Sequence, residues 1–311
     1  MARYRAAVLE EFRKDFKIVE VEKDEPPVGW CRLRVRATGV CGRDRVVWAG
    51  GFRNLRTPLV LGHEVFGEYN GEPYAVYPLV RLWGSRGRID TILGEHVQGG
   101  YAEYVDVPCS NLIPLPDTRF EVYAASVCGV ATMIHLARLV GIKRGERVLL
   151  TGVSGGVGIH GAQYLVKLGV EVYGYTRRRE LVDTLRSIDI IPVESFEFYK
   201  KEGRVDYVVE IVGAPTINES IRALRPGGVL VLVGNVSGEP IVIERPALLV
   251  MRELAIRGTA AYSFEEYREA IDFASRGSLR AFYRVYSLEE INRAYRDISS
   301  GKVVGRAIIA P

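Results

Sequence analysis

Residues 147–158 read RVLLTGVSGGVG, an apolar run that leads directly into a glycine-rich turn. The run predicts a β-strand, and the residues from 158 to 169 predict a helix after the turn. Glycines at such a junction let the backbone turn tightly and approach a pyrophosphate, which then lies at the helix N-terminus. A turn that is rich in glycine only for packing is the alternative. We predict that this segment is a dinucleotide-binding loop, with contacts from Gly152, Ser154, Gly155, Gly156, Val157 and Gly158.

The sequence around this loop alternates strands and helices. Apolar runs predict further strands, and amphipathic segments between them predict helices. The strands are expected at 170–176, 206–213, 227–234 and 253–258, and the helices at 179–187 and 215–224. This rhythm is typical of a Rossmann-type, doubly wound parallel sheet with helices on both faces, so we expect an α/β fold.

The N-terminal part has a different pattern. Up to about residue 115, alternating apolar and polar residues are punctuated by Gly and Pro, which predicts a small antiparallel barrel or sandwich. A long helical pattern covers 121–142, and the C-terminal end adds two amphipathic helices and a final strand. We expect residues 1–127, completed by 263–311, to form a catalytic domain, and residues 128–262 to form the nucleotide-binding domain.

The composition narrows the functional classes. The chain of 311 residues is 48% hydrophobic and carries a net charge of +4. Its basic residues are scattered, so we expect no nucleic-acid partner. We expect no membrane span, because no window approaches about 18 uninterrupted apolar residues. Acidic residues near the N-terminus argue against a signal peptide and favour a cytoplasmic protein. With only two Gln and six Asn, the composition fits a heat-adapted, thermostable protein. We interpret Cys31 and Cys109 as packed thiols.

The end of the second strand of the alternation predicts the cofactor. NAD-binding folds usually place Asp or Glu there to hold the ribose 2′-OH, whereas this chain has Thr176 followed by Arg177, Arg178 and Arg179. Guanidinium groups bind a 2′-phosphate, and no carboxylate stands there to repel it. A solvated helix start is the alternative, although cations there oppose the helix dipole. We therefore predict NADP(H), with Thr176, Arg177 and Arg178 at the 2′ position.

Three further segments carry metal-ligand residue types. Cys41 opens CGRD, His63 and Glu64 follow Gly62, and Cys128 lies in the long helical segment. Two thiolates and an imidazole are ordinary zinc ligands, and three ligands leave an open position for catalysis. By spacing alone the pattern is weak, because a lone Cys in an apolar stretch is usually packed in the core.

Several motifs together resemble the medium-chain, zinc-type alcohol dehydrogenase superfamily over essentially the whole chain. They are CGRD at 41–44, LGHEVFG at 61–67, GGYAEYV at 99–105, VCGVAT at 127–132, GVSGGVG at 152–158, VGAPT at 212–216, RPGGVLVLVG at 225–234 and GKVVGRAII at 301–309. The resemblance implies a GroES-like catalytic domain joined to the Rossmann domain. It also implies a homodimer or homotetramer that acts on a small molecule.

The same resemblance assigns roles to individual residues. It implies one catalytic-type zinc held by Cys41, His63 and Cys128, with Glu64 beside it and Asp44 orienting His63. Four positions would contact the cofactor: Thr132, Val212 and Val233 at the nicotinamide, and Arg306 at the pyrophosphate.

Two departures from the family pattern affect the expected chemistry. Between Cys41 and Cys109 the chain has no cysteine, so we expect no structural zinc. The family's usual proton relay, Ser or Thr followed by His, is replaced by Arg43 and Val46. Arg is a poor general acid and Val cannot relay a proton.

The motifs leave three functions open. The first is an NADP(H)-dependent zinc alcohol dehydrogenase or carbonyl reductase that acts on bulky, apolar ketones or aldehydes. The second, suggested by a closer likeness to archaeal acryloyl-CoA reductases and quinone oxidoreductases, is an enoyl-CoA or quinone reductase with a non-catalytic zinc site. In that reading Arg43 would stabilise an enolate oxygen or a CoA phosphate. The third is a non-enzymatic, cofactor-binding regulator or structural protein.

Overall fold

A computed structural model describes residues 2–84, 87–235 and 238–311, although not the side chains of 82–90. The chain divides into two compact units. Unit 1 comprises Met1–Val127, Ile271–Gly277 and Ala281–Pro311, and unit 2 comprises Cys128–Ala270 and Ser278–Arg280. The C-terminal boundary thus falls inside helix α8 (Phe264–Ser275), after Ala270, whereas the sequence led us to expect it before the helix.

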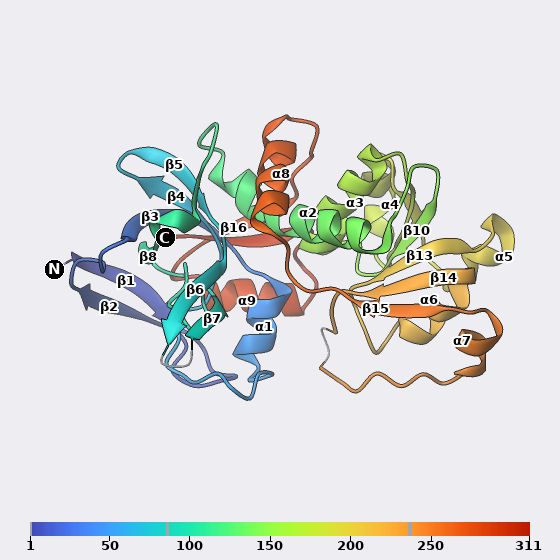
Figure 1. The fold of residues 1–311 in the computed structure, drawn as a ribbon, viewed down its shortest axis with the longest axis horizontal. Helices are drawn as coiled ribbons and strands as arrows, with labels where there is room; N and C mark the ends of the chain where they lie inside the picture. The colour runs from blue at the N-terminus through green and yellow to red at the C-terminus, as the bar shows by residue number, and fades with distance from the viewer. Residues whose placement is uncertain (1, 85–86, 236–237) are drawn as a thin grey trace. The chain divides into compact units, whose positions relative to one another are not determined.

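Unit 2 is built on a parallel sheet, as predicted, and the sheet has six strands (Figure 1). Its strand order is β12-β11-β10-β13-β14-β15, so the order reverses between β10 and β13. The strands are β10 (Arg147–Leu150), β11 (Glu171–Tyr175), β12 (Ile191–Val193), β13 (Val205–Glu210), β14 (Leu224–Leu232) and β15 (Ala255–Gly258). The three-residue strand β12 was not predicted.

Alternating side chains of these strands build two cores. Val148 and Leu150 pack on one face with α2 (Phe120–Val140), α3 (Gly156–Lys167) and α4 (Val182–Arg186). Leu149 packs on the other face with α6 (Ile217–Ala223). Because both faces are covered, the strands are almost continuously apolar. Two short helices complete unit 2: α5 (Tyr199–Glu202) and α7 (Ala247–Met251).

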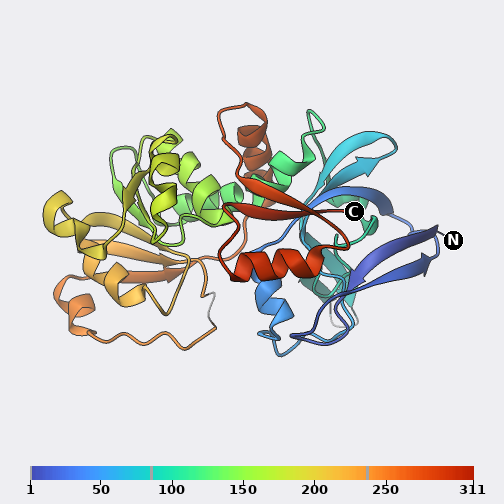
Figure 2. The ribbon, with the colours of Figure 1, turned by 180° about the vertical axis from the view of Figure 1, so that it is seen from behind.

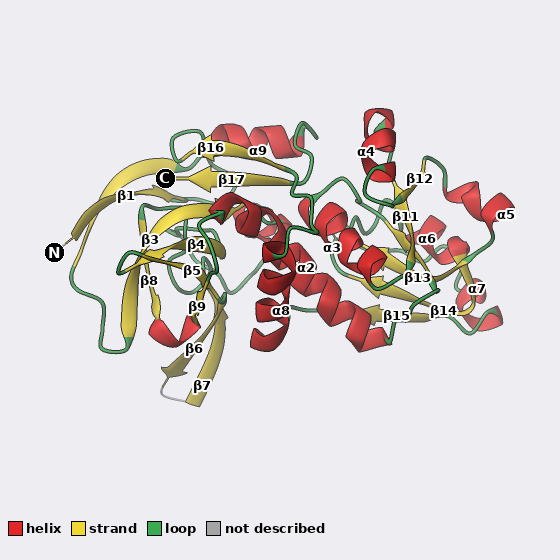
Figure 3. Cartoon of the chain, turned by 90° about the horizontal axis from the view of Figure 1, so that it is seen from above, coloured by secondary structure: helices red, strands yellow, loops and turns green. Residues whose placement is uncertain are grey.

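Unit 1 is mainly antiparallel and gathers both ends of the chain (Figures 2 and 3). Its main sheet has the order β16-β17-β3-β4-β5-β9, with β8 also paired to β3, and two hairpins, β1–β2 and β6–β7, flank it. The strands are β1 (Ala2–Val8), β2 (Lys17–Lys23), β3 (Trp30–Gly39), β4 (Glu64–Tyr69), β5 (Glu72–Val76), β6 (Leu79–Gly84), β7 (Gly87–Ile92), β8 (Tyr104–Pro108), β9 (Leu112–Pro114), β16 (Tyr283–Ser287) and β17 (Arg306–Ala310). Helices α1 (Gly42–Trp48) and α9 (Ile291–Ser299) accompany them.

Cys31 and Cys109 are joined in a disulfide, so their interpretation as packed thiols was wrong. Strand β3 pairs with β8 in a register that sets Cys31 opposite Val107 and Trp30 opposite Pro108. This register brings the Cα atoms of the two cysteines to 5.1 Å, within the range that a disulfide requires. Their sequence separation of 78 residues hid the pairing.

Helix α2 is the long helix that the sequence predicted. By length and composition it could cross a membrane, and it is the one helix in the described part of the chain that could. However, 78% of its most apolar window is buried inside the protein, as in the core helix of a globular fold.

Candidate metal and cofactor sites

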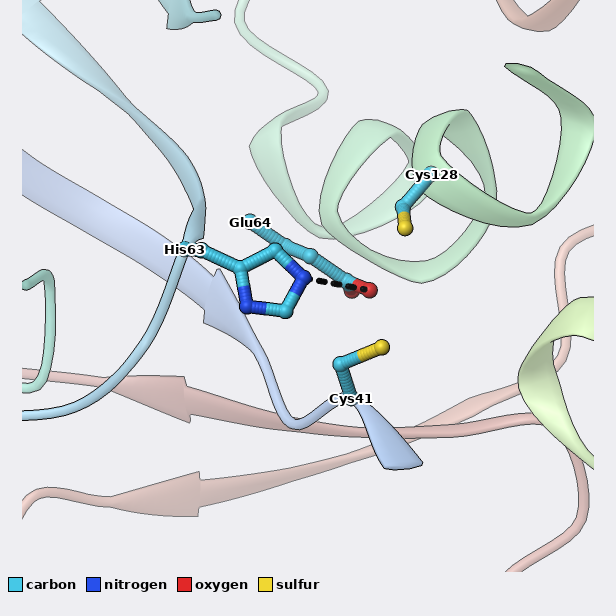
Figure 4. A group of neighbouring side chains, drawn as sticks. All are labelled: Cys41, His63, Glu64 and Cys128. Atoms are coloured by element: carbon cyan, nitrogen blue, oxygen red, sulfur yellow. Dashed lines mark ion pairs between the residues drawn. The ribbon is translucent and has the colours of Figure 1, made fainter. Parts of the chain in front are cut away.

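The predicted metal ligands lie together. Cys41 stands between β3 and α1, His63 and Glu64 stand at the start of β4, and Cys128 lies on α2. Their potential ligand atoms are all within 4.8 Å of one another, and all four residues are buried. The four side chains converge, with His63 facing Glu64 (Figure 4). Along α2, Cys128 directly follows Val127, the last residue that the helix contributes to unit 1.

Asp44 organises this cluster from the first turn of α1. One carboxylate oxygen lies 3.0 Å from His63 Nδ1, and the other accepts the backbone N–H of Cys41 at 2.8 Å. With Nδ1 bound to a carboxylate, Nε2 is the nitrogen left to ligate a metal. That nitrogen is 4.0 Å from Glu64 Oε1. The contacts agree with the orienting role predicted for Asp44.

Glu64 can reach the cluster because its neighbour Gly39 has no side chain. A Cβ at Gly39 would lie 2.1 Å from Glu64 Oε2 and 2.5 Å from the carbonyl oxygen of Ala124. Burial raises the pKa of Glu64 to about 8, against the opposing effect of Arg306 and with a further rise from Cys41. Both carboxylate oxygens are buried without a hydrogen bond.

Arg306 belongs to the same cluster. Its guanidinium lies 3.0 Å from Glu64 Oε1, and Nη1 donates to the carbonyl oxygen of Val40 at 3.3 Å. The side chain is only 4% exposed. The pyrophosphate contact predicted for Arg306 stays a prediction, whereas its pairing with Glu64 was not predicted.

The donor set fits zinc. Two sulfurs, an imidazole nitrogen and a carboxylate oxygen are zinc ligand types, and their mutual distances suit one small ion. The oxygens of Glu64 are buried and accept no hydrogen bond, so they are available to a cation bound beside them.

The relay position next to this cluster has a different chemistry. Arg43 forms a two-pronged ion pair with Glu95, with Nη2 to Oε2 at 3.1 Å, and its guanidinium stacks over the ring of Phe52. Glu95 is buried, and sequence reasoning missed it. Because Glu95 balances its charge, Arg43 is a poorer site for an enolate or phosphate than its sequence position suggested.

In unit 2 the glycine-rich turn has the geometry of a phosphate-binding loop. Gly152 has φ of +64°, and a Cβ at Gly158 would lie 2.4 Å from the carbonyl oxygen of Gly152. Gly155 caps the N-terminus of α3 and is exposed. A Cβ at Gly155 would have only the carbonyl oxygen of Gly152, in the same turn, near it. Ser154 and Val157 are half-buried beside it. The loop therefore leaves an accessible helix N-terminus, where an anion binds well.

At the end of β11, Thr176 is buried and its hydroxyl accepts the backbone N–H of Arg178 at 3.0 Å. Arg178 pairs with Glu180, and Arg179 pairs with Glu194. Arg177 is exposed and forms no ion pair within the described residues. Arg177 is thus the guanidinium best placed to take a new anionic partner.

The remaining predicted cofactor residues occupy strand ends and a helix. Val212 follows β13, and Val233 follows β14, where its N–H donates to the carbonyl oxygen of Glu210 at 2.9 Å. The hydroxyl of Thr132 donates to the carbonyl oxygen of Cys128, four residues earlier on α2. Their contacts with a cofactor stay predictions.

Comparisons with known proteins identify the family. Residues 27–71 match the alcohol dehydrogenase GroES-like domain, and residues 156–276 match the zinc-binding dehydrogenase domain. The chain is 29% identical to an acryloyl-coenzyme A reductase of Sulfurisphaera tokodaii, over an alignment that covers 99% of this chain and 100% of the relative. It is 28% identical to an alcohol dehydrogenase of Geobacillus stearothermophilus, over 98% and 99% of the two chains.

A solved structure agrees along the whole chain. The thermostable alcohol dehydrogenase of Pyrobaculum aerophilum superposes with a TM-score of 0.88 at 26% identity, covering 100% of both chains. The domain matches, the full-length relatives and the fold point to one family of oxidoreductases. This chain belongs to the medium-chain, zinc-type alcohol dehydrogenase superfamily.

Proposed function

We propose that the protein is an NADP(H)-dependent, zinc-dependent carbonyl reductase that acts on bulky, apolar ketones or aldehydes, or runs the reverse reaction. The observation that carries this proposal is the convergence of Cys41, His63, Glu64 and Cys128 on one buried point. A site that served only packing would not need four metal-ligating residues with their ligand atoms within 4.8 Å of one another.

Zinc would supply Lewis acidity toward a carbonyl oxygen, and NADPH would supply the hydride. Cys41, His63 and Cys128 would hold the metal, with Asp44 fixing the ring of His63. In the metal-free chain burial raises the pKa of Glu64 to about 8, whereas a bound zinc ion would favour the ionised carboxylate. Of the groups that could replace the missing relay (Glu64, water or a cofactor ribose hydroxyl), water or the ribose hydroxyl would then supply the proton. Arg43 forms an ion pair with Glu95, and the side chain of Val46 has no exchangeable proton to pass on, so small polar alcohols should be poor substrates.

The alternative is an NADPH-dependent enoyl-CoA or quinone reductase with a non-catalytic zinc site. The absence of Ser or Thr at position 43 favours it, as does the similarity to an acryloyl-coenzyme A reductase. In such a reaction hydride adds to a carbon–carbon double bond conjugated to a carbonyl.

One substrate distinguishes the two reactions. A bulky cyclic enone is offered with NADPH to the zinc-loaded protein, the chelated protein and a Cys128→Ser variant, and the product is identified by mass spectrometry and NMR. An allylic alcohol that is lost on chelation and in Cys128→Ser supports the proposal. A saturated ketone that forms in all three samples refutes it and supports the alternative. No NADPH consumption with any carbonyl or enone refutes both.

We also propose a cytoplasmic, heat-adapted homo-oligomer. The Cys31–Cys109 disulfide agrees with this combination, because intracellular proteins of hyperthermophiles are unusually rich in disulfides. The edge strand β15 is exposed along its length, and Ile256, Val250 and Met251 are exposed apolar side chains of β15 and α7. These features suit an association between copies through this edge.

A further inference from the structure

Glu210 is a fully buried carboxylate at the last position of β13, and the mechanism above does not use it. Oε1 accepts hydrogen bonds from the backbone N–H groups of Val212 at 3.1 Å and Gly213 at 2.8 Å. It also accepts from the hydroxyls of Thr151 at 2.6 Å and Thr216 at 2.7 Å. Oε2 accepts from the hydroxyl of Ser220 at 2.5 Å.

These donors are those of an ionised carboxylate. The two backbone groups can only donate. The hydroxyl of Thr151 accepts the N–H groups of Ile211 at 2.9 Å and Val212 at 3.3 Å, which occupy both of its lone pairs, so its own proton is directed to Glu210. No Lys, Arg or His among the described residues forms an ion pair with this carboxylate. Glu210 therefore places a negative charge, without a cationic partner, inside unit 2.

The charge lies at the point where the strand order of the sheet reverses. Thr151 directly follows β10, just before the glycine-rich loop, and Glu210 ends β13 on the other side of the reversal. Dinucleotides bind across the carboxyl ends of strands at such a point. In such folds the 2′ end of the adenosine half would lie near the end of β11, so the half that carries the nicotinamide would lie toward the ends of β13 and β14.

Oxidised nicotinamide carries a positive charge that reduced nicotinamide lacks, whereas the pyrophosphate and 2′-phosphate are the same in both forms. A fixed negative charge near the nicotinamide half therefore discriminates between the two oxidation states. We propose that Glu210 makes the site bind the oxidised cofactor more tightly, relative to the reduced one, than an uncharged residue there would. This inference rests on the nicotinamide cofactor of the proposed function but not on its substrate.

Glu210→Gln tests the charge without dismantling the network. The amide oxygen can keep the contacts of Oε1, and the hydroxyl of Ser220 can accept from the amide nitrogen in place of donating to Oε2. At an effective dielectric of about 20, unit charges still interact appreciably across about 10 Å, so Glu210 need not touch the nicotinamide to change its binding severalfold. We expect Glu210→Gln to weaken NADP⁺ relative to NADPH by roughly fivefold or more. Ser220→Ala, which keeps the charge and removes one donor, is the matched control and should leave the ratio unchanged.

A second variant moves the charge in the opposite direction. Asn235, half-buried after β14, accepts the N–H of Ala214 through Oδ1 at 3.2 Å, on the loop that follows Gly213. Asn235→Asp adds a negative charge beside that loop, at the loss of the hydrogen bond that Nδ2 donates to the carbonyl oxygen of Glu239 at 2.7 Å, and should strengthen NADP⁺ relative to NADPH. It also keeps the inference testable should Glu210→Gln fail to fold.

Dissociation constants of both oxidation states are measured by fluorescence titration and calorimetry for the wild type and the three variants, with circular dichroism to check folding. Opposite shifts of the ratio in Glu210→Gln and Asn235→Asp, with none in Ser220→Ala, support the inference. An unchanged ratio in a folded Glu210→Gln, or in Asn235→Asp when the former does not fold, overturns it. Binding of NAD⁺ and NADH in place of the NADP pair would refute the cofactor preference proposed above, and the same ratios would then decide this inference. A wild-type protein that binds neither pair overturns both.

Discussion

Loss of the Cys31–Cys109 disulfide should destabilise unit 1 and leave unit 2 unaffected. Both cysteines lie in unit 1, and the bond links β3 to the segment that follows β8. A disulfide stabilises mainly by restricting the unfolded chain, and the effect grows with the length of the closed loop. Cys31 is buried whereas Cys109 is exposed, so a reductant can reach the bond from one side.

The expected magnitude follows from the sequence separation of 78 residues. In the chain-entropy model, a loop of this length corresponds to about 4.5 kcal/mol at 25 °C. Measured values are commonly smaller, so we expect the free energy of unfolding of unit 1 to fall by about 2–4 kcal/mol. For a unit of this size, such a loss lowers the unfolding midpoint by roughly 5–15 °C.

Tryptophan fluorescence measures this unit selectively, because Trp30, Trp48 and Trp83 all belong to unit 1. Thermal unfolding is compared for the oxidised wild type, the reduced wild type and the double variant Cys31→Ala/Cys109→Ala, all free of metal. The last two should unfold together, well below the first, while cofactor binding to unit 2 is retained. A double variant that unfolds at the midpoint of the oxidised wild type would refute the reasoning.

Three further predictions concern the metal, the cofactor and assembly. Because burial raises the pKa of Glu64 to about 8, the metal-free protein holds a proton on this carboxyl at pH 7 and loses stability as pH rises from about 4.5 to 8. Zinc binding should expel that proton, so the Glu64→Gln variant should release about one proton fewer than the wild type when it binds zinc. Calorimetry in two buffers measures the number of protons released, and equal release by both proteins would contradict this prediction. Arg177→Ala should raise the dissociation constant of NADPH about tenfold without changing that of NADH. Arg179→Ala is the control and should change neither constant much, because Arg179 already pairs with Glu194. Fluorescence titrations measure both constants, and equal responses of NADPH and NADH to Arg177→Ala would contradict the assignment. Ile256→Asp on the exposed edge strand β15 should dissociate the homo-oligomer proposed above, as measured by light scattering, whereas the control Val285→Asp on β16 should not. An unchanged mass for Ile256→Asp would exclude this edge as the interface between copies.

The parallel sheet was predictable because its central strands, such as β10 and β13, are largely buried, and burial on both faces leaves an apolar run in the sequence. Strand β12 and helix α7 were missed because a strand of three residues and a helix of five carry too little periodicity. The disulfide was missed for another reason. Cys31 pairs with Cys109 only because β3 and β8 adopt a particular register, and register depends on contacts across the whole sheet.

At the metal site, residue types and motifs were enough to name the four converging residues. The partners of Arg43 and Arg306 were not predictable, because each is a carboxylate far along the chain, Glu95 and Glu64 respectively. Only the folded chain shows that these guanidinium groups are already paired. This changes their chemistry, since a paired Arg is a weaker ligand for a substrate anion than an unpaired one.

Glu210 shows how the sequence could have been interpreted further. An acidic residue interrupts the apolar run DYVVEIVG, in a strand whose sheet is covered on both faces. A buried carboxylate costs several kcal/mol unless donors surround it, so its presence there already implied a network. Three hydroxyl side chains, Thr151 at the end of β10 and Thr216 and Ser220 before and on α6, supply part of it. The carboxylate also holds the loop after β13 in place, because it accepts the N–H groups of Val212 and Gly213. A neutral amide could keep most of these contacts, so the charge itself is the part of Glu210 that the network does not require and that the cofactor ratio in Glu210→Gln tests.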